Sequence, residues 1–234
     1  MMSRIRIYWN KGIEQAPIIV QKCYESVCKH SNQKIILLND QNLADYIRLP
    51  DYIEKKKDAG QIPMAGYADL MRFALLEHYG GTWIDSTVYL TDPIPDMILN
   101  SDFFAVRNSL LLIDNPVLYP AWFLHAKKGN KTIREIRNVA FAYWLKNEHV
   151  IEYLLPNLII TLVVKSNPEV EKAIPYMNSD YSEYLVKVLA DDYSEEKWNW
   201  IKKLTGIHKL TYKLSPDIEA EGTFYKALIE NSIE

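Results

Sequence analysis

Asp69, Arg72 and Asp85 are the residues whose types and spacing best suit chemistry on a charged substrate. Asp69 and Arg72 lie three positions apart in a segment with a helical pattern, so they share one helix face. A surface ion pair of small energetic value would explain these two residues equally well. Asp85 lies among apolar residues, where a carboxylate needs a partner, a metal ion or a place at the open end of a strand.

The residues around these three side chains indicate a helix, a turn and a strand. A helix is predicted to begin at Tyr67 and to stop at Tyr79, because Gly80 and Gly81 can adopt the left-handed conformation that ends a helix. Thr82–Leu90 is rich in β-branched and aromatic residues, which favours one strand. Ligands collect at the carboxyl ends of strands in α/β sheets, so we expect the three charged side chains to meet in one crevice there.

The start of the chain has the strand–helix–strand order of an α/β unit with parallel strands. Arg4–Trp9 alternates charged and apolar residues, Ile18–Lys29 has one apolar stripe, and Lys34–Leu38 is a short apolar run. We expect one domain over residues 1–234, with an α/β part over 1–107 and a mostly helical part over 108–234. Beyond Asp96 the patterns predict strands at Asp102–Val106 and Trp122–Ala126, helices at Thr132–Asn147, Val150–Lys165, Glu169–Tyr176, Tyr184–Leu189 and Ser194–Leu204, and a strand or extended segment at His208–Leu214.

Composition and charge exclude several classes of protein. The net charge of −3 gives no push toward nucleic acid, and we find no basic motif, so no nucleic-acid partner is expected. The longest apolar stretch, Val150–Val164, is interrupted by Glu152 and Pro156, whereas a membrane span needs about 20 mostly apolar residues. Met1–Tyr8 also lacks the apolar run of a signal peptide. We therefore expect a cytoplasmic protein, with peripheral contact to the inner face of the cell membrane left open.

The stretch Tyr67–Thr87 resembles the core of the bacterial capsular polysaccharide synthesis glycosyltransferases. It is also similar to the wider group of sugar transferases with an Asp-x-Asp ("DxD") motif, such as the glycosyltransferase 32 group and the glucosylating clostridial toxins. In that group a helix with Asp-x-x-Arg precedes Tyr-Gly-Gly, a hydrophobic strand and Asp-x-Asp, and the order and spacing match here. The resemblance covers about residues 4–95, and it also touches Trp122–Gly129 and His208–Tyr212.

This resemblance implies a GT-A fold, which is a Rossmann-like mixed sheet flanked by helices that binds a nucleotide sugar. It implies a hexosyltransferase that moves a sugar from a UDP-linked donor, with retention of configuration. The acceptor would be a growing capsular or other surface polysaccharide, or its lipid-linked precursor. Residues 1–107 would bind the donor, and the mostly helical residues 108–234 would face the acceptor. Carried over by position, Arg72 and Asp85 would be catalytic. Trp9 would stack on the nucleobase and Asn42 would contact the nucleoside, and the rest of the donor site would consist of Asp69, Arg72, Trp83, Asp85, Ser86, Thr87, His208 and Lys209.

One position departs from the family pattern, since Asp85-Ser86-Thr87 stands where Asp-x-Asp is expected. A cation at the leaving diphosphate acts where negative charge develops, and oxygen ligands suit Mn²⁺ or Mg²⁺. The resemblance implies Asp85, Thr87 and His208 as the metal ligands. A threonine hydroxyl is neutral and binds metal more weakly, so the need for a metal is uncertain, and His208 and Lys209 are the candidates to compensate.

Three interpretations remain open at this point. The leading one is a glycosyltransferase. The second is a protein of the same fold that binds a nucleotide sugar with little or no turnover, since Thr87 replaces a carboxylate. The third is a phosphatase with Asp85 as nucleophile, although the haloacid dehalogenase group requires an Asp-x-Asp after its first strand that this chain lacks. His208 could also be a purely structural residue.

Overall fold

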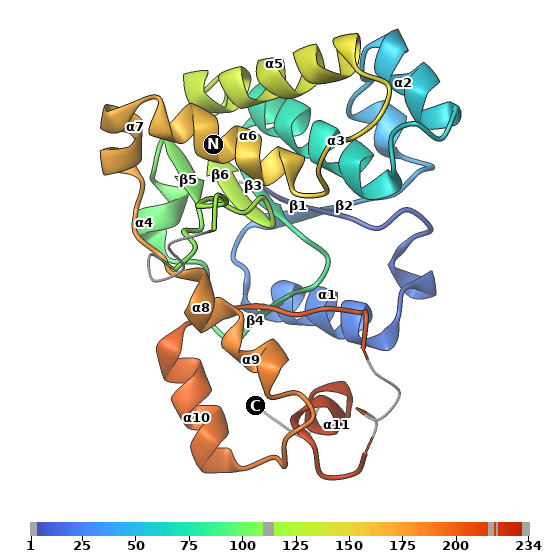
Figure 1. Ribbon diagram of the computed structural model, residues 1–234. Helices are drawn as coiled ribbons and strands as arrows, with labels where there is room; N and C mark the ends of the chain where they lie inside the picture. Colours follow the sequence, from blue (N-terminus) through green and yellow to red (C-terminus); the bar gives the residue numbers. More distant parts are fainter. Residues whose placement is uncertain (1–3, 110–114, 215–217, 219, 231–234) are drawn as a thin grey trace.

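A five-stranded mixed sheet forms the centre of the protein (Figure 1). The computed structural model describes residues 4–109, 115–214, 218 and 220–230. The strand order is β2-β1-β3-β6-β5, with β1 parallel to β2 and β3, and β6 antiparallel to β3 and β5. The carboxyl ends of three parallel strands therefore share one edge. The strands are β1 (Arg4–Tyr8), β2 (Lys34–Leu38), β3 (Gly81–Ile84), β5 (Phe103–Ala105) and β6 (Phe123–Ala126).

Helices cover both faces of this sheet, and apolar side chains fill the space between the layers (Figure 1). On one face lie α2 (Asp51–Asp58), α3 (Met64–Tyr79), α5 (Lys131–Lys146) and α6 (Leu155–Lys165). On the other lie α1 (Ile18–His30) and a second, two-stranded antiparallel sheet of β4 (Val88–Leu90) and β7 (Ile207–Lys209). The shorter elements are η1 (Ile13–Gln15), η2 (Leu43–Asp45), α4 (Asp96–Leu99), α7 (Pro168–Ala173), α8 (Ser179–Ser182), α9 (Tyr184–Lys187), α10 (Glu195–Leu204) and α11 (Phe224–Ile229).

The Gly80-Gly81 turn joins α3 to β3 under close steric constraint. A Cβ on Gly80 would lie 2.4 Å from the Lys128 backbone nitrogen, and one on Gly81 would lie 2.5 Å from the Arg4 carbonyl oxygen. Both glycines have positive φ, 66° and 97°, which favours glycine. The buried Arg6 donates a hydrogen bond of 2.6 Å to the Gly80 carbonyl. Side chains of α3 and of the end of β3 are thereby held in a fixed relation.

The predicted single strand Thr82–Leu90 is wrong, because the chain turns in its middle. Asp85–Thr87 leave the central sheet after β3, with the Val88 N–H bonded to the Asp85 carbonyl at 2.9 Å, and β4 then joins the second sheet. This break places the motif in a turn, where its side chains can reach a ligand.

Two predicted helix starts also shift. The helix predicted from Val150 begins at Leu155, since Pro156 lies in its first turn, where proline is tolerated. The helix predicted from Tyr67 already begins at Met64, directly after Pro63.

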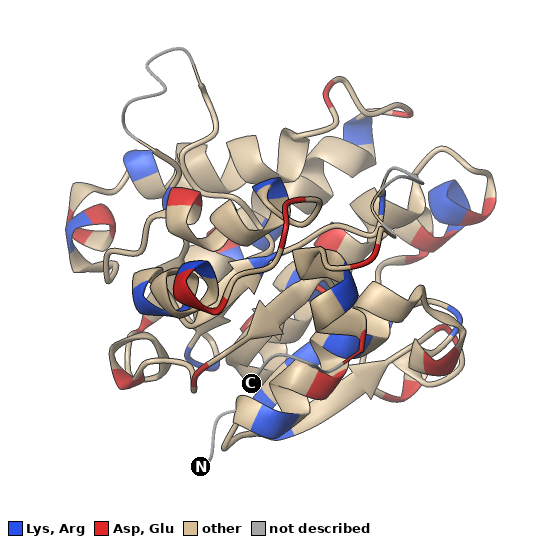
Figure 2. Cartoon of the chain, turned by 90° about the horizontal axis from the view of Figure 1, so that it is seen from below, with Lys and Arg blue, Asp and Glu red and all other residues tan. Residues whose placement is uncertain are grey.

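The segment 108–234 contributes to both sheets, as β6 in the first and β7 in the second. The predicted division of roles at residue 107 remains a prediction. Lys and Arg are intermixed with Asp and Glu over the helices and loops of the fold (Figure 2). Among the described residues, none of the helices combines the length and the apolar character needed to cross a membrane.

Candidate active site

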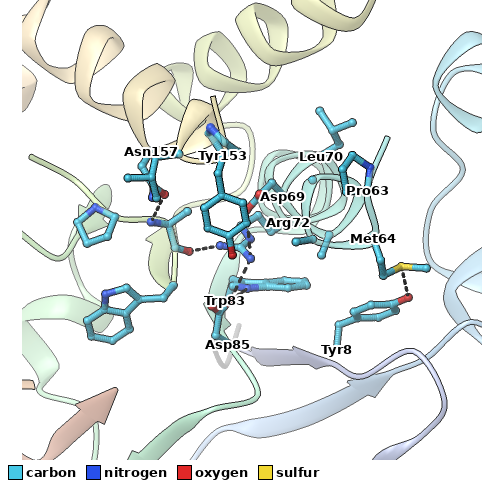
Figure 3. A pocket seen from close by; sticks show the side chains of 18 of the residues that line it. Tyr8, Pro63, Met64, Asp69, Leu70, Arg72, Trp83, Asp85, Tyr153 and Asn157 are labelled. Carbon is cyan, nitrogen blue, oxygen red and sulfur yellow. Dashed lines mark hydrogen bonds and ion pairs between the residues drawn. The ribbon is translucent and has the colours of Figure 1, made fainter. Parts of the chain in front are cut away.

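A cavity of about 660 Å³ opens at the edge of the sheet where β1 and β3 end. Trp9 follows β1, and Asp85, Ser86 and Thr87 follow β3, while Asp69 and Arg72 project from α3 (Figure 3). Asp69, Arg72 and Asp85 therefore meet in one crevice, as the sequence pattern predicted. Seven further side chains on its wall are Tyr8, Trp83, Trp122, Tyr153, Asn157, Lys209 and Tyr212.

Arg72 joins the two carboxylates and is nearly buried, with 6% of the residue exposed. One terminal nitrogen lies 3.2 Å from Asp69 Oδ1 and 3.0 Å from Asp85 Oδ1, and the other donates to the Ala121 carbonyl. The guanidinium carbon lies 5.1 Å from the centre of the Trp83 ring, within reach of a cation–π attraction. A planar guanidinium held by these partners has one orientation, so Arg72 fixes the position of both carboxylates.

Asp85 is held on one oxygen and open on the other. Oδ1 forms an ion pair with Arg72 and accepts a hydrogen bond of 3.1 Å from the Trp83 indole N–H. Its backbone N–H donates to the Trp122 carbonyl at 2.8 Å, which fixes the turn against β6. Oδ2 faces Lys209, whose Nζ lies 3.8 Å away. Asp85 therefore presents one carboxylate oxygen to the cavity.

Asp69 has an unusual ionisation for an aspartate. Burial raises its pKa from 3.8 to about 6; the attraction of Arg72 opposes this rise, and the negative charge of Asp85 adds to it. Two carboxylates thus share one guanidinium, and this favours a net charge close to zero on the group formed by Asp69, Arg72 and Asp85.

Lys209 reaches the motif from the C-terminal half of the chain. Its ammonium donates to the Thr87 hydroxyl at 2.5 Å and to the Leu210 carbonyl at 3.2 Å. The Leu210 N–H is bonded to the Thr87 carbonyl at 2.8 Å, so the register of β7 against β4 sets this position. Sequence reasoning included Lys209, but only the strand pairing shows that it lies at Thr87.

His208 was predicted to complete the donor site as a metal or phosphate ligand. Successive residues of a strand point to opposite faces, so His208 faces the core while Lys209 faces the cavity. His208 is fully buried, with Nε2 3.1 Å from the Thr91 hydroxyl, and burial lowers its pKa to about 4. This geometry favours a structural histidine, and the ligand role stays a prediction.

Asn42, predicted to contact the nucleoside, is not among the residues that line the cavity, and its predicted role stays a prediction. Its Oδ1 accepts the Asn39 N–H at 2.9 Å and its Nδ2 donates to the Leu37 carbonyl at 3.0 Å. The side chain closes the loop after β2, which is a common task for asparagine.

Sequence reasoning missed several of these wall residues, and three of them have contacts or positions that matter for the site. Tyr212 lies edge-on to Trp9, with ring centres 5.3 Å apart. Asn157 Oδ1 accepts the Ala121 N–H at 2.9 Å and so supports the residue whose carbonyl binds Arg72. Tyr153 stands at the rim with 73% of its surface exposed (Figure 3). Tyr212 ends the segment His208–Tyr212 that the family resemblance touches, the chain's 16 tyrosines were the only signal for Tyr153, and Asn157 gave none.

Comparison with known proteins decides the family. The family described as "Capsular polysaccharide synthesis protein" matches residues 1–228. This chain belongs to that family. No curated protein matches the chain.

Solved structures show the fold. The apo form of the glycosyltransferase GlyE of Streptococcus pneumoniae TIGR4 is similar at 14% identity and a TM-score of 0.56, covering 100% of this chain and 61% of that one. A second GlyE structure is similar at 15% identity and 0.53, with the same coverage. The PaToxG glycosyltransferase matches at 11% identity and 0.49 over 97% of this chain and 85% of that one. The capsular synthesis protein thus spans 61% of the GlyE chains, and the predicted GT-A fold, an α/β mixed sheet flanked by helices, is confirmed.

Proposed function

We propose that this capsular polysaccharide synthesis protein is a glycosyltransferase that uses a nucleotide sugar, with a UDP-linked donor as the first candidate. The observation that carries the proposal is the cluster of Asp69, Arg72 and Asp85 in a large cavity at the carboxyl edge of the sheet. Ligands of α/β sheets bind at this edge. The acceptor would be a surface saccharide or its lipid-linked precursor, met at the inner face of the cell membrane.

The cavity contains the groups that such a donor needs. Trp9 and Tyr212 offer aromatic faces for a nucleobase. Asp85 Oδ2, which faces the cavity and Lys209, can accept a hydrogen bond from a ribose hydroxyl. The Lys209 ammonium has three donors and uses two of them on Thr87 and Leu210, so one remains for a phosphate oxygen. A cation at that place stabilises the negative charge that grows on the leaving diphosphate.

The carboxylates support transfer with retention. Asp69 and Asp85 both form ion pairs with Arg72, which lowers the reactivity of either carboxylate as a nucleophile. In a front-side displacement the acceptor oxygen bonds to the anomeric carbon as the bond to the diphosphate breaks, and the acceptor proton passes to the leaving phosphate oxygen. This route needs no protein nucleophile. The same contacts argue against a phosphatase with Asp85 as nucleophile.

A donor screen tests the proposal. We expect the purified protein to release nucleoside diphosphate from at least one nucleotide sugar, with or without added saccharide. Asp85→Ala should lower this rate by about 10²-fold or more, the usual cost of removing one group from a charged reaction centre. Asp58→Ala, which removes an exposed aspartate at the end of α2, is the control. Full activity of Asp85→Ala would refute the site.

The second candidate is a nucleotide-sugar-binding protein without turnover, and Thr87 in place of a carboxylate favours it. It predicts that UDP raises the melting temperature while no donor is consumed with any acceptor. Turnover of one donor would exclude it.

A further inference from the structure

We propose that the Lys209 ammonium occupies the place of the divalent cation, so that donor binding needs no metal. This inference rests on the glycosyltransferase function proposed above. It starts from the exchange of the second motif carboxylate for Thr87, whose hydroxyl accepts a hydrogen bond from Lys209 at 2.5 Å. A positive charge is thus fixed between the two end residues of the motif, because Asp85 Oδ2 lies 3.8 Å from the same nitrogen.

The backbone holds this charge in place. β7 pairs with β4 antiparallel, with Lys209 opposite Val88, the residue that follows the motif. The Lys209 ammonium is also bonded to the Leu210 carbonyl, and only 22% of its side chain is exposed. The ammonium is therefore a preorganised part of the cavity wall, and it need not be drawn in by a ligand.

The remaining groups do not fit a divalent cation. Mg²⁺ is usually held by one or two carboxylates together with waters and substrate phosphates, and the motif offers a single carboxylate and a neutral hydroxyl. Arg72 occupies Asp85 Oδ1 at 3.0 Å and Lys209 faces Oδ2, so an incoming ion would meet two positive charges at its only acidic ligand. Within the described part of the chain, no group of three or more His, Cys, Asp or Glu side chains could hold a metal ion.

The charges balance without a metal. Arg72 and Lys209 offset Asp69 and Asp85, and Lys213 also lines the cavity. Arg72 has its terminal nitrogens committed to Asp69, Asp85 and Ala121, so it acts as a positioning residue. At the motif itself, Lys209 is the cation with a donor left for the diphosphate.

Calorimetric binding of nucleoside diphosphates to the metal-stripped protein tests the inference. UDP, GDP, CDP and dTDP are titrated in EDTA and again with Mn²⁺. We expect at least one to bind with an affinity that agrees within about twofold in the two buffers. Lys209→Ala should weaken binding by about tenfold to a hundredfold in both, the value of a hydrogen bond to a charged group. Lys203→Ala removes an exposed lysine of α10 and should change nothing.

A pair of substitutions gives the sharpest outcome. Thr87→Asp combined with Lys209→Ala restores two carboxylates and removes the ammonium, so binding should now require Mn²⁺. Lys209→Arg keeps the charge and should retain part of the affinity in EDTA, which separates loss of charge from loss of fold. Circular dichroism checks the fold of each variant.

Two results would overturn the inference, and only the second would also refute the proposed function. Wild-type binding that EDTA abolishes and Mn²⁺ restores, with Lys209→Ala unchanged, would show that a metal fills this role while the proposed function stands. Absence of binding of every nucleoside diphosphate in both buffers would refute the glycosyltransferase proposal itself, and the role of Lys209 would fall with it.

Discussion

The ionisation of Asp69 makes the free energy of unfolding depend on pH in a way that one substitution can isolate. Its carboxyl has a pKa of about 6 in the folded protein, against 3.8 as the ordinary value. Burial is the main cause, since only 17% of the side chain is exposed. A rise of about two pKa units corresponds to about 3 kcal/mol.

The sign follows from proton binding. Between the two pKa values the folded protein holds a proton that the unfolded chain has lost, so stability falls as pH rises through this window. The contribution of Asp69 protonation to the free energy of unfolding is fully present below pH 3.8 and is lost above about pH 6. From these two pKa values, roughly half of it disappears between about pH 5 and about pH 8.

Urea unfolding of wild type and Asp69→Asn across this pH range measures the effect. Other titrating groups are common to both proteins and largely cancel in the difference. We expect the Asp69→Asn variant to be less stable than wild type, or equal to it, near pH 5 and to gain roughly 1 kcal/mol on wild type by pH 8. A difference that stays flat with pH would show that Arg72 keeps Asp69 ionised with an ordinary pKa, and the reasoning on the site charge would fail.

Two further predictions concern the scaffold. Gly81→Ala should destabilise the protein by at least about 2 kcal/mol in urea unfolding, because its Cβ would lie 2.5 Å from a carbonyl oxygen at a φ of 97°. Gly60→Ala, with φ of 73° and nothing within 4 Å, carries backbone strain alone and should cost about 1 kcal/mol; equal losses would contradict the steric argument. His208→Gln should lower the unfolding free energy by about 1–3 kcal/mol, since a buried partner is lost, and leave the rate of donor cleavage within about threefold. A loss of donor cleavage as large as that expected for Asp85→Ala would show that His208 acts in the donor site.

The helix-turn-strand unit could be read from the sequence because its signals are local. Apolar periodicity marks α3, the two glycines mark its end, and β-branched residues mark β3. The break after Ile84 could not be read in this way, since Val88–Leu90 continues the same residue preferences. It depends on a partner strand, β7, that lies more than a hundred residues away in the sequence.

The chain by itself determined the fold class, the family resemblance and the meeting of Asp69, Arg72 and Asp85. Helix periodicity and the rule that parallel strands end at one edge are sufficient for the α/β class and for the meeting of the three residues, while the resemblance rests on the motif residues Tyr67–Thr87. Only the tertiary structure decided between His208 and Lys209, because strand register chooses which of two neighbours faces the cavity. It also decided that an ammonium lies at Thr87, since two segments far apart in sequence meet there through backbone pairing.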